Sequence, residues 1–328
     1  MPTDTNNIDW TALSANPGTV HLLEHHLDKV DWTALSGNRS AVHLLEQHPE
    51  KIDWAVLSRN TAAFHLLERR LDIEDTLGVA HPIALTDITV RQAVKLWTEN
   101  EADATAMYGH IRDWDVSEVT NMDKLFMFNS KFDGDIVWWD VRNVTSMEYM
   151  FYGAKQFNKN IGGWDVGNVV NMSHMFAFTG CFDQPIGKWI VGNVTNMSSM
   201  FCGAVSFNQP IGKWDVHRVT DMGDMFSDTP LFDQDIGHWD VSSVCVMKRM
   251  FMNAARFDQP IGGWNVGNVR NMSSMFKNAP LFNQPLWPWP VNRVESSQHM
   301  FVGATAFKQD LREWVLCGLP VPSPTDNQ

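Results

Sequence analysis

The feature that most constrains this chain is a tryptophan that recurs every 25 residues without an insertion or a deletion. A phenylalanine keeps the same period twelve residues after each of the first eight tryptophans. Eight full copies run through 111–310 and a ninth begins at Leu311. So strict a period indicates a solenoid, because each coil must lie in register on the last. The tryptophans are Trp114, Trp139, Trp164, Trp189, Trp214, Trp239, Trp264, Trp289 and Trp314.

These periodic aromatic residues are expected to form the structural core. A coil this short encloses little interior, so a few large side chains must fill it, and methionine fills the irregular gaps between them. Burying each such group contributes roughly 1.5–3 kcal/mol, so the layers need no cofactor. The core prediction covers the nine tryptophans together with Phe151, Phe176, Phe201, Phe226, Phe251, Phe276 and Phe301.

One coil can be interpreted segment by segment. In 194–204, Val194, Met197, Met200 and Phe201 fall on one face of a short helix, which Thr195 or Asn196 could cap. The stretch 207–216, "FNQPIGKWDV", has proline and glycine between short apolar positions and predicts a tight turn with a short strand. We therefore expect an α/β solenoid of the leucine-rich-repeat kind. Each coil would contribute one parallel strand and one helical turn.

An aspartate often follows the periodic tryptophan, which leaves two roles open. A ladder of carboxylates could bind calcium, which prefers several oxygen ligands. Each side chain could instead accept a backbone N–H within its own turn. Asn265, Ile190 and Pro290 at equivalent positions favour the turn role, so we predict no metal site. The ladder consists of Asp115, Asp140, Asp165, Asp215 and Asp240.

A second repeat, of 22 residues, precedes the solenoid, with Trp10, Trp32 and Trp54 in equivalent places. Each copy predicts two short helices joined by a tight turn. An aspartate stands at the N-cap before each tryptophan, and Asn16 followed by Pro17 starts the second helix of the first copy. The aspartates are Asp9, Asp31 and Asp53.

One histidine also recurs in each 22-residue copy and could suggest a metal ladder. Successive histidines lie a full repeat apart, and the accompanying glutamates are common on helix surfaces, so we favour a structural role. The residues are His21, His43 and His65, with Glu24, Glu46 and Glu68.

Between the two systems, Val90, Ala93, Val94 and Trp97 mark an amphipathic helix with Asp87 as its candidate N-cap. A solenoid cannot leave its first apolar coil open to water, so this helix is expected to cap the array. The expected parts are helical repeats at 1–74, a junction with a capping helix at 75–110, the solenoid at 111–314 and a polar, proline-containing tail at 315–328.

Composition narrows the classes of function. The formal net charge of -13 argues against nucleic acid and against anionic membrane surfaces. No segment is apolar enough to insert in a membrane and no secretory leader is recognisable, which favours the host cytoplasm or a virion. The cysteines share no metal-binding spacing, so no cofactor is expected. They are Cys181, Cys202, Cys245 and Cys317.

The repeat "FNQPIGxWDVxNVTNMxxMFxGA" resembles the 25/26-residue surface-protein repeat of mycoplasma and Listeria lipoproteins, grouped with BspA-like leucine-rich repeats. The resemblance covers roughly residues 80–314. The 22-residue units resemble helical repeats of giant viruses, and together the two suggest a large DNA virus or a marine protist. The resemblance implies adhesion or protein binding. The chain shows neither the lipoprotein signal nor the cell-wall sorting motif of the bacterial members.

Three kinds of function can then be compared. Core positions repeat while 198–199, 202–203 and 205–206 change to different residues at 248–249, 252–253 and 255–256. This pattern predicts a monomeric, non-enzymatic scaffold that binds a protein through a variable face. The alternative is a structural component of a virion or an adhesin-like component of a cell surface, which self-association would reveal. No catalytic motif is present, so an enzyme is not expected.

Overall fold

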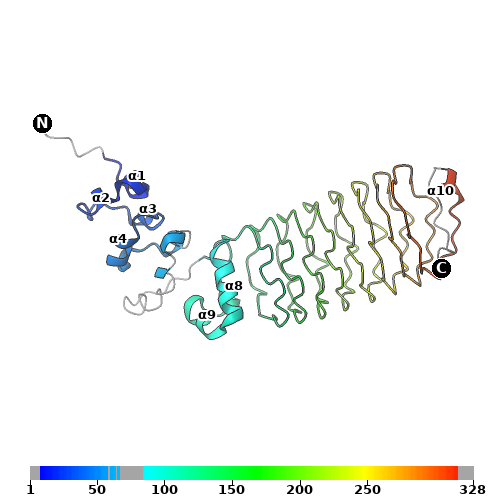
Figure 1. Ribbon diagram of the computed structural model, residues 1–328, viewed down its shortest axis with the longest axis horizontal. Helices are drawn as coiled ribbons and strands as arrows, with labels where there is room; N and C mark the ends of the chain where they lie inside the picture. The colour runs from blue at the N-terminus through cyan, green and yellow to red at the C-terminus, as the bar shows by residue number, and fades with distance from the viewer. Residues whose placement is uncertain (1–7, 58–59, 64, 67–83, 317–328) are drawn as a thin grey trace. The chain divides into compact units, whose positions relative to one another are not determined.

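The computed structural model describes residues 8–57, 60–63, 65–66 and 84–316 (Figure 1). The chain divides into two compact units, Met1–Glu118 and Val119–Gln328. The expected boundary near residue 74, most of the expected tail at 315–328 and Glu68 lie outside the described residues. The four expected parts therefore stay predictions. Among the described residues, no helix has the length and apolar character that crossing a membrane requires.

The first unit begins with short helices in the predicted pairs. Asp9, Asp31 and Asp53 each accept a backbone N–H three residues on, at 2.9–3.1 Å, so the predicted N-caps are confirmed. Asn16 likewise caps the turn that starts at Pro17. The elements are α1 (Trp10–Ala15), η2 (Pro17–Thr19), α2 (Val20–Leu23), α3 (Trp32–Ser36), α4 (Val42–Gln47), η3 (Pro49–Lys51), α5 (Trp54–Leu57) and η4 (Thr61–Ala63).

Polar contacts join each 22-residue copy to the one before it. The Ser14 hydroxyl accepts the Asp31 N–H, and the buried Asn38 amide donates to the Ser14 carbonyl at 2.9 Å. Ser36, Asp53 and Asn60 repeat both contacts one copy later. Because these groups are buried and paired, they set the register between copies, while buried leucines supply the core.

The recurrent histidines pair with glutamates of the preceding copy. His43 Nε2 lies 2.9 Å from Glu24 Oε1, and His65 Nε2 lies 2.6 Å from Glu46 Oε1. Both pairs are exposed. Within the described residues, no group of three or more His, Cys, Asp or Glu side chains could hold a metal ion. His43 and His65 thus each connect their own copy to the copy before it.

The unit ends with α8 (Thr89–Glu99), α9 (Glu101–Tyr108) and η5 (Ile111–Asp113). The predicted amphipathic helix is confirmed as α8, but its predicted cap is wrong. Ile88 occupies the N-cap position without a capping bond, and the Thr86 hydroxyl accepts the Thr89 N–H instead. The reason is that Thr86 and Thr89 bond reciprocally, since the Thr86 N–H also donates to Thr89 Oγ1.

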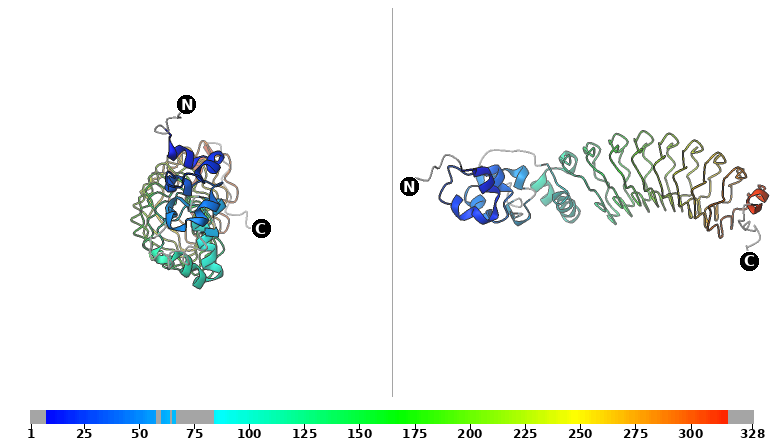
Figure 2. Two further views of the ribbon diagram at one scale, coloured as in Figure 1. Left: turned by 90° about the vertical axis from the view of Figure 1, so that its left-hand side faces the viewer. Right: turned by 90° about the horizontal axis from the view of Figure 1, so that it is seen from above.

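The second unit is a row of stacked coils, the green to orange part of Figure 1 and the right panel of Figure 2. Two phenylalanines of each coil stack face to face, with ring centroids 3.8–4.0 Å apart. Each also stacks on its equivalent in the next coil: the series from Phe126 to Phe301 at 5.5–5.8 Å, and the series from Phe132 to Phe307 at 5.7–6.2 Å. Apart from Phe307 at the end of its column, these phenylalanines are buried and form a continuous core.

Backbone hydrogen bonds run between coils rather than along helices. In one coil the N–H groups of residues 197, 199, 201 and 203 donate to carbonyls 221, 223, 225 and 227 of the next, at 2.8–3.0 Å. The N–H groups of residues 200, 202 and 204 close turns three residues back in their own coil. Ser199 and Gly203 have positive φ values of 55° and 68°, and equivalent residues do so in the other coils.

The expected helical turn at 194–204 is therefore wrong, and so is the place of the expected strand. Two left-handed residues per coil, four positions apart, reverse the peptide planes, so alternate N–H groups leave the coil and no helix can form. The strand is a single residue per coil, linked by a parallel bridge such as Asn196 to Asp221. It lies inside the expected helix, whereas 207–216 forms the predicted tight turn without a strand.

Side chains add two more ladders along the coils. Each tryptophan indole from Trp164 to Trp314 donates to a carbonyl 28 residues earlier, at 3.1–3.2 Å. On another side, an Asn or Asp side chain at every 25th residue from Asp133 to Asn283 accepts the equivalent backbone N–H of the next coil. The last coil ends in α10 (Arg312–Leu316). The coils are thus joined by side chains as well as by backbone.

Coil spacing leads to a first prediction, at Gly262. A Cβ atom placed there would lie 2.4 Å from the Pro285 carbonyl oxygen of the next coil, whereas one on Gly263 would meet nothing within 4 Å. Gly262→Ala should therefore lower the free energy of unfolding by about 1–3 kcal/mol, because the coils cannot keep their spacing. The urea midpoint of Gly263→Ala should match the wild type. Equal midpoints for the two variants would contradict this account.

Candidate functional site: a hollow on the turn face

The bridged segments of the solenoid present a surface that we call the turn face: the side chains that point away from the core in 121–128 and its equivalents up to 296–303. Large apolar residues of these segments, such as Met197 and Phe201, point inward and are fully buried. The residues between them point outward. Because the backbone bonds do not depend on these outward side chains, their identity is free to change from coil to coil.

One hollow of about 380 Å³ lies on the turn face and spans five successive coils. Its floor consists of small side chains, and larger side chains flank it on either side along the coil axis. It is open to solvent. The positions 198–199, 202–203 and 248–249, which vary between coils in the sequence, all contribute to the hollow. The floor residues are Ser198, Ser199 and Cys202.

The aromatic wall of the hollow belongs to the two coils before the floor. The rings of Tyr149 and His174 stack at 4.3 Å with an angle of 5°. Tyr152 contacts Phe178 edge to face at 5.3 Å. Phe178 lies over Gly203, where an added Cβ atom would come 2.5 Å from its ring. The rings support one another, which holds them in place although Phe178 is 45% exposed.

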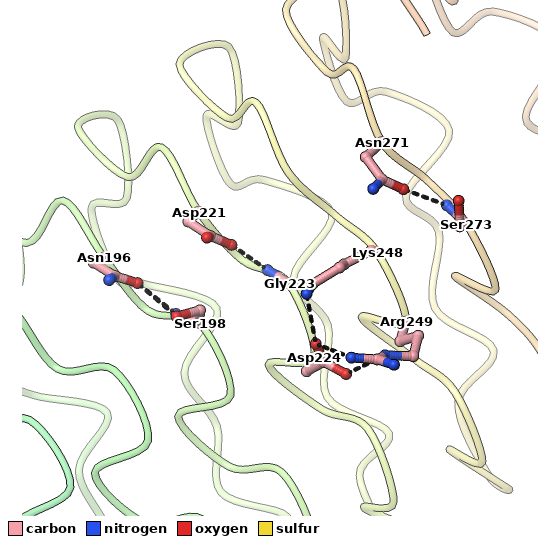
Figure 3. Close-up of polar contacts among 9 residues, drawn as sticks. All are labelled: Asn196, Ser198, Asp221, Gly223, Asp224, Lys248, Arg249, Asn271 and Ser273. Carbon is pink, nitrogen blue, oxygen red and sulfur yellow. Dashed lines mark hydrogen bonds and ion pairs between the residues drawn. The ribbon is translucent and has the colours of Figure 1, made fainter. Parts of the chain in front are cut away.

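The charged wall belongs to the two coils after the floor (Figure 3). Arg249 binds both oxygens of Asp224, at 2.7 and 3.2 Å, and Lys248 approaches the same carboxylate at 3.9 Å. Asp221 also lines the hollow, and its Oδ1 accepts the N–H of Gly223 at 2.8 Å. The Asp224 side chain is only 14% exposed, so its pair with Arg249 is better shielded than the ion pairs elsewhere on the surface.

Burial sets the charge states around the hollow. It lowers the pKa of His174, against the opposing effect of nearby carboxylates, so the ring is neutral at neutral pH. It raises the pKa of the Cys202 thiol to about 12, with help from Asp224 and Asp228. It also raises the pKa of Tyr149. The bond to Asp224 raises the pKa of Arg249, which keeps its charge.

These charge states suit binding better than catalysis. A thiol with a pKa of about 12 is protonated at neutral pH and is a poor nucleophile. The hollow combines rigid rings, hydroxyl groups and a shielded ion pair, which can contact another molecule without reacting with it.

The residues predicted as the core lie elsewhere. All nine periodic tryptophans and the seven phenylalanines are buried, and none lines the hollow. The aspartates after the tryptophans accept a backbone N–H two residues on, at 3.0–3.3 Å, as the turn interpretation requires. The aromatic wall, formed by Tyr149, Tyr152, His174 and Phe178, was not predicted: these residues occupy variable positions of their coils, and only the stacking of coils brings them together.

A family model described as "Mycoplasma protein of unknown function, DUF285" matches residues 98–212 and again residues 200–314. Searches of curated proteins and of solved structures find no match.

The high pKa of the Cys202 thiol leads to a second prediction. A pKa near 12 leaves roughly one thiol in ten thousand ionised at pH 8. Only the ionised form, the thiolate, reacts with an alkylating reagent. Iodoacetamide should therefore modify Cys202 at least about a hundredfold more slowly than the exposed Cys181 in the folded protein. Mass spectrometry of timed samples measures both rates. In denaturant the two rates should converge, and equal rates in the folded protein would refute the prediction.

Proposed function

The chain belongs to the family described as Mycoplasma protein of unknown function, DUF285, and on that premise we propose that it is a non-enzymatic scaffold that binds a protein partner through the turn face. The observation that carries the proposal is the hollow. The side chains that line it differ from coil to coil, whereas the buried residues of the same coils are repeated.

The composition of the hollow supports a protein partner. Aromatic residues and arginine are the side chains that most often dominate binding energy at protein interfaces. Tyr152 and Phe178 present ring surface, and Arg249 is held by Asp224. Because these groups are already positioned by their neighbours, a partner loses little free energy in ordering them.

The solenoid also suits a scaffold in its energetics. Its stability comes from the aromatic columns and the backbone ladder, neither of which uses the outward side chains of the turn face. The face can therefore acquire a binding site without loss of the fold. This arrangement favours an interaction surface of the kind that solenoids commonly provide.

A third prediction tests the proposal. Full-length protein, immobilised on a resin and exposed to an extract of the organism that makes it, should capture a specific protein. Phe178→Ala should weaken the affinity of that complex by roughly ten- to a hundredfold, because the exposed ring of the aromatic wall is lost. The captured protein is identified by mass spectrometry and its affinity measured by calorimetry.

The matched control is Trp287→Ala. Trp287 is an aromatic residue that is also exposed, at 60%, but it belongs to a different segment of its coil. This variant should bind with wild-type affinity. If Phe178→Ala keeps the partner while Trp287→Ala loses it, the binding site is not on the turn face.

A further inference from the structure

The backbone of the turn face is fully engaged around the hollow. The carbonyl groups of residues 196, 198, 200 and 202 accept N–H groups from the preceding coil, and the N–H groups of residues 197, 199, 201 and 203 donate to the following one. The Ser198 N–H donates to the Asn196 side chain. An extended partner cannot add itself here as a further strand, because strand addition needs a row of free backbone groups. Side chains must provide the recognition.

The charged wall carries two carboxylates and two cations, but both cations pair with the same carboxylate. Asp224 holds both nearby cations, Arg249 and Lys248. Asp221 lines the same hollow, and among the residues that the structure describes none forms an ion pair with it. An anionic ligand would meet both carboxylates and would have to compete with Asp224 for Arg249 and Lys248. A cationic ligand would find in Asp221 a carboxylate that forms no ion pair with the described residues.

The aromatic wall suits the carbon stem of a long cationic side chain. Tyr152 and Phe178 supply rings on the opposite side of the floor from Asp221. The neutral thiol of Cys202 and the neutral ring of His174 add no positive charge. The long carbon chains of arginine and lysine can pack on rings while the charged end remains solvated or paired.

From these observations we propose that the hollow receives a basic side chain, arginine or lysine, from an extended segment of the protein partner. The side chain lies across Ser198, Ser199 and Cys202, with its stem against Tyr152 and Phe178 and its charge beside Asp221. The net charge of -13 on the whole chain attracts such a partner at long range. This inference rests on the proposed scaffold function and specifies the chemistry of the partner.

The test uses short blocked peptides with full-length protein. The peptides are acetyl-Gly-Ser-Gly-Xaa-Gly-Ser-Gly-amide with arginine, citrulline or glutamate at the central position. Citrulline has nearly the shape of arginine without its charge. Ligand-observed NMR titration to about 10 mM peptide covers the affinities that a single side chain can provide. The arginine peptide should bind, the citrulline peptide should bind about tenfold more weakly, and the glutamate peptide should not bind.

The protein variant that isolates the charge is Asp221→Asn. Asn171, Asn196 and Asn271 occupy the same coil position, and Asn196 and Asn271 accept the same turn bond that Asp221 makes. The variant should therefore keep the fold and lose only the charge, so the arginine peptide should bind about tenfold more weakly. Asp240→Asn, which removes a carboxylate from a turn of another coil segment, should leave binding unchanged.

The outcomes separate this inference from the scaffold proposal. Equal binding of the arginine and glutamate peptides, unchanged arginine binding by Asp221→Asn, or no binding of the arginine peptide would each overturn the basic-side-chain inference. The scaffold proposal would stand in all three cases as long as Phe178→Ala still weakens the complex with the captured protein. Loss of that dependence on Phe178 would overturn both.

Discussion

The second unit depends on one backbone constraint: every other N–H group of the bridged segment must leave its own coil and donate to the next. Left-handed residues at two positions per coil, Ser199 and Gly203 in one of them, make this possible. An α-helix would satisfy the same groups internally and leave the coils unjoined. Adopting positive φ at a non-glycine residue costs free energy, so the ladder must compensate for it coil after coil. The result is a stack in which the joining of coils replaces the helix.

This ladder also sets the spacing that the core has to fill. Phenylalanine rings of adjacent coils stack 5.5–6.2 Å apart, and the indole of each periodic tryptophan from Trp164 to Trp314 donates to a carbonyl of the coil before it. The same spacing requires glycine at position 262, because the Pro285 carbonyl of the next coil leaves no room for a methyl group there. Core residues are therefore repeated because every coil meets the same geometry. The outward side chains of the turn face do not pack between coils, so their identity can vary from one coil to the next.

The hollow shows how a repeated structure can acquire one specific place. The hollow forms because the turn-face side chains of one coil, Ser198 and Cys202 among them, are small, while those of the coils before and after it are large. Aromatic rings stand on one side and the Asp224–Arg249 pair on the other. The site is specific because neighbouring coils carry different outward side chains, while the backbone of every coil keeps the same conformation. A partner can thus be selected by side-chain changes alone, with the fold left intact.

The sequence by itself determined the solenoid, its 25-residue period, the aromatic residues that fill it, and the caps of the N-terminal helices at Asp9, Asp31 and Asp53. These follow from periodicity and from bonds between residues close along the chain. Only the tertiary structure decided that 194–204 is a run of turns and not a helix, because the bonds that prevent the helix go to residues 24 positions away. It alone decided the hollow too, since Tyr149 and Arg249 are 100 residues apart and meet only through the stacking of coils.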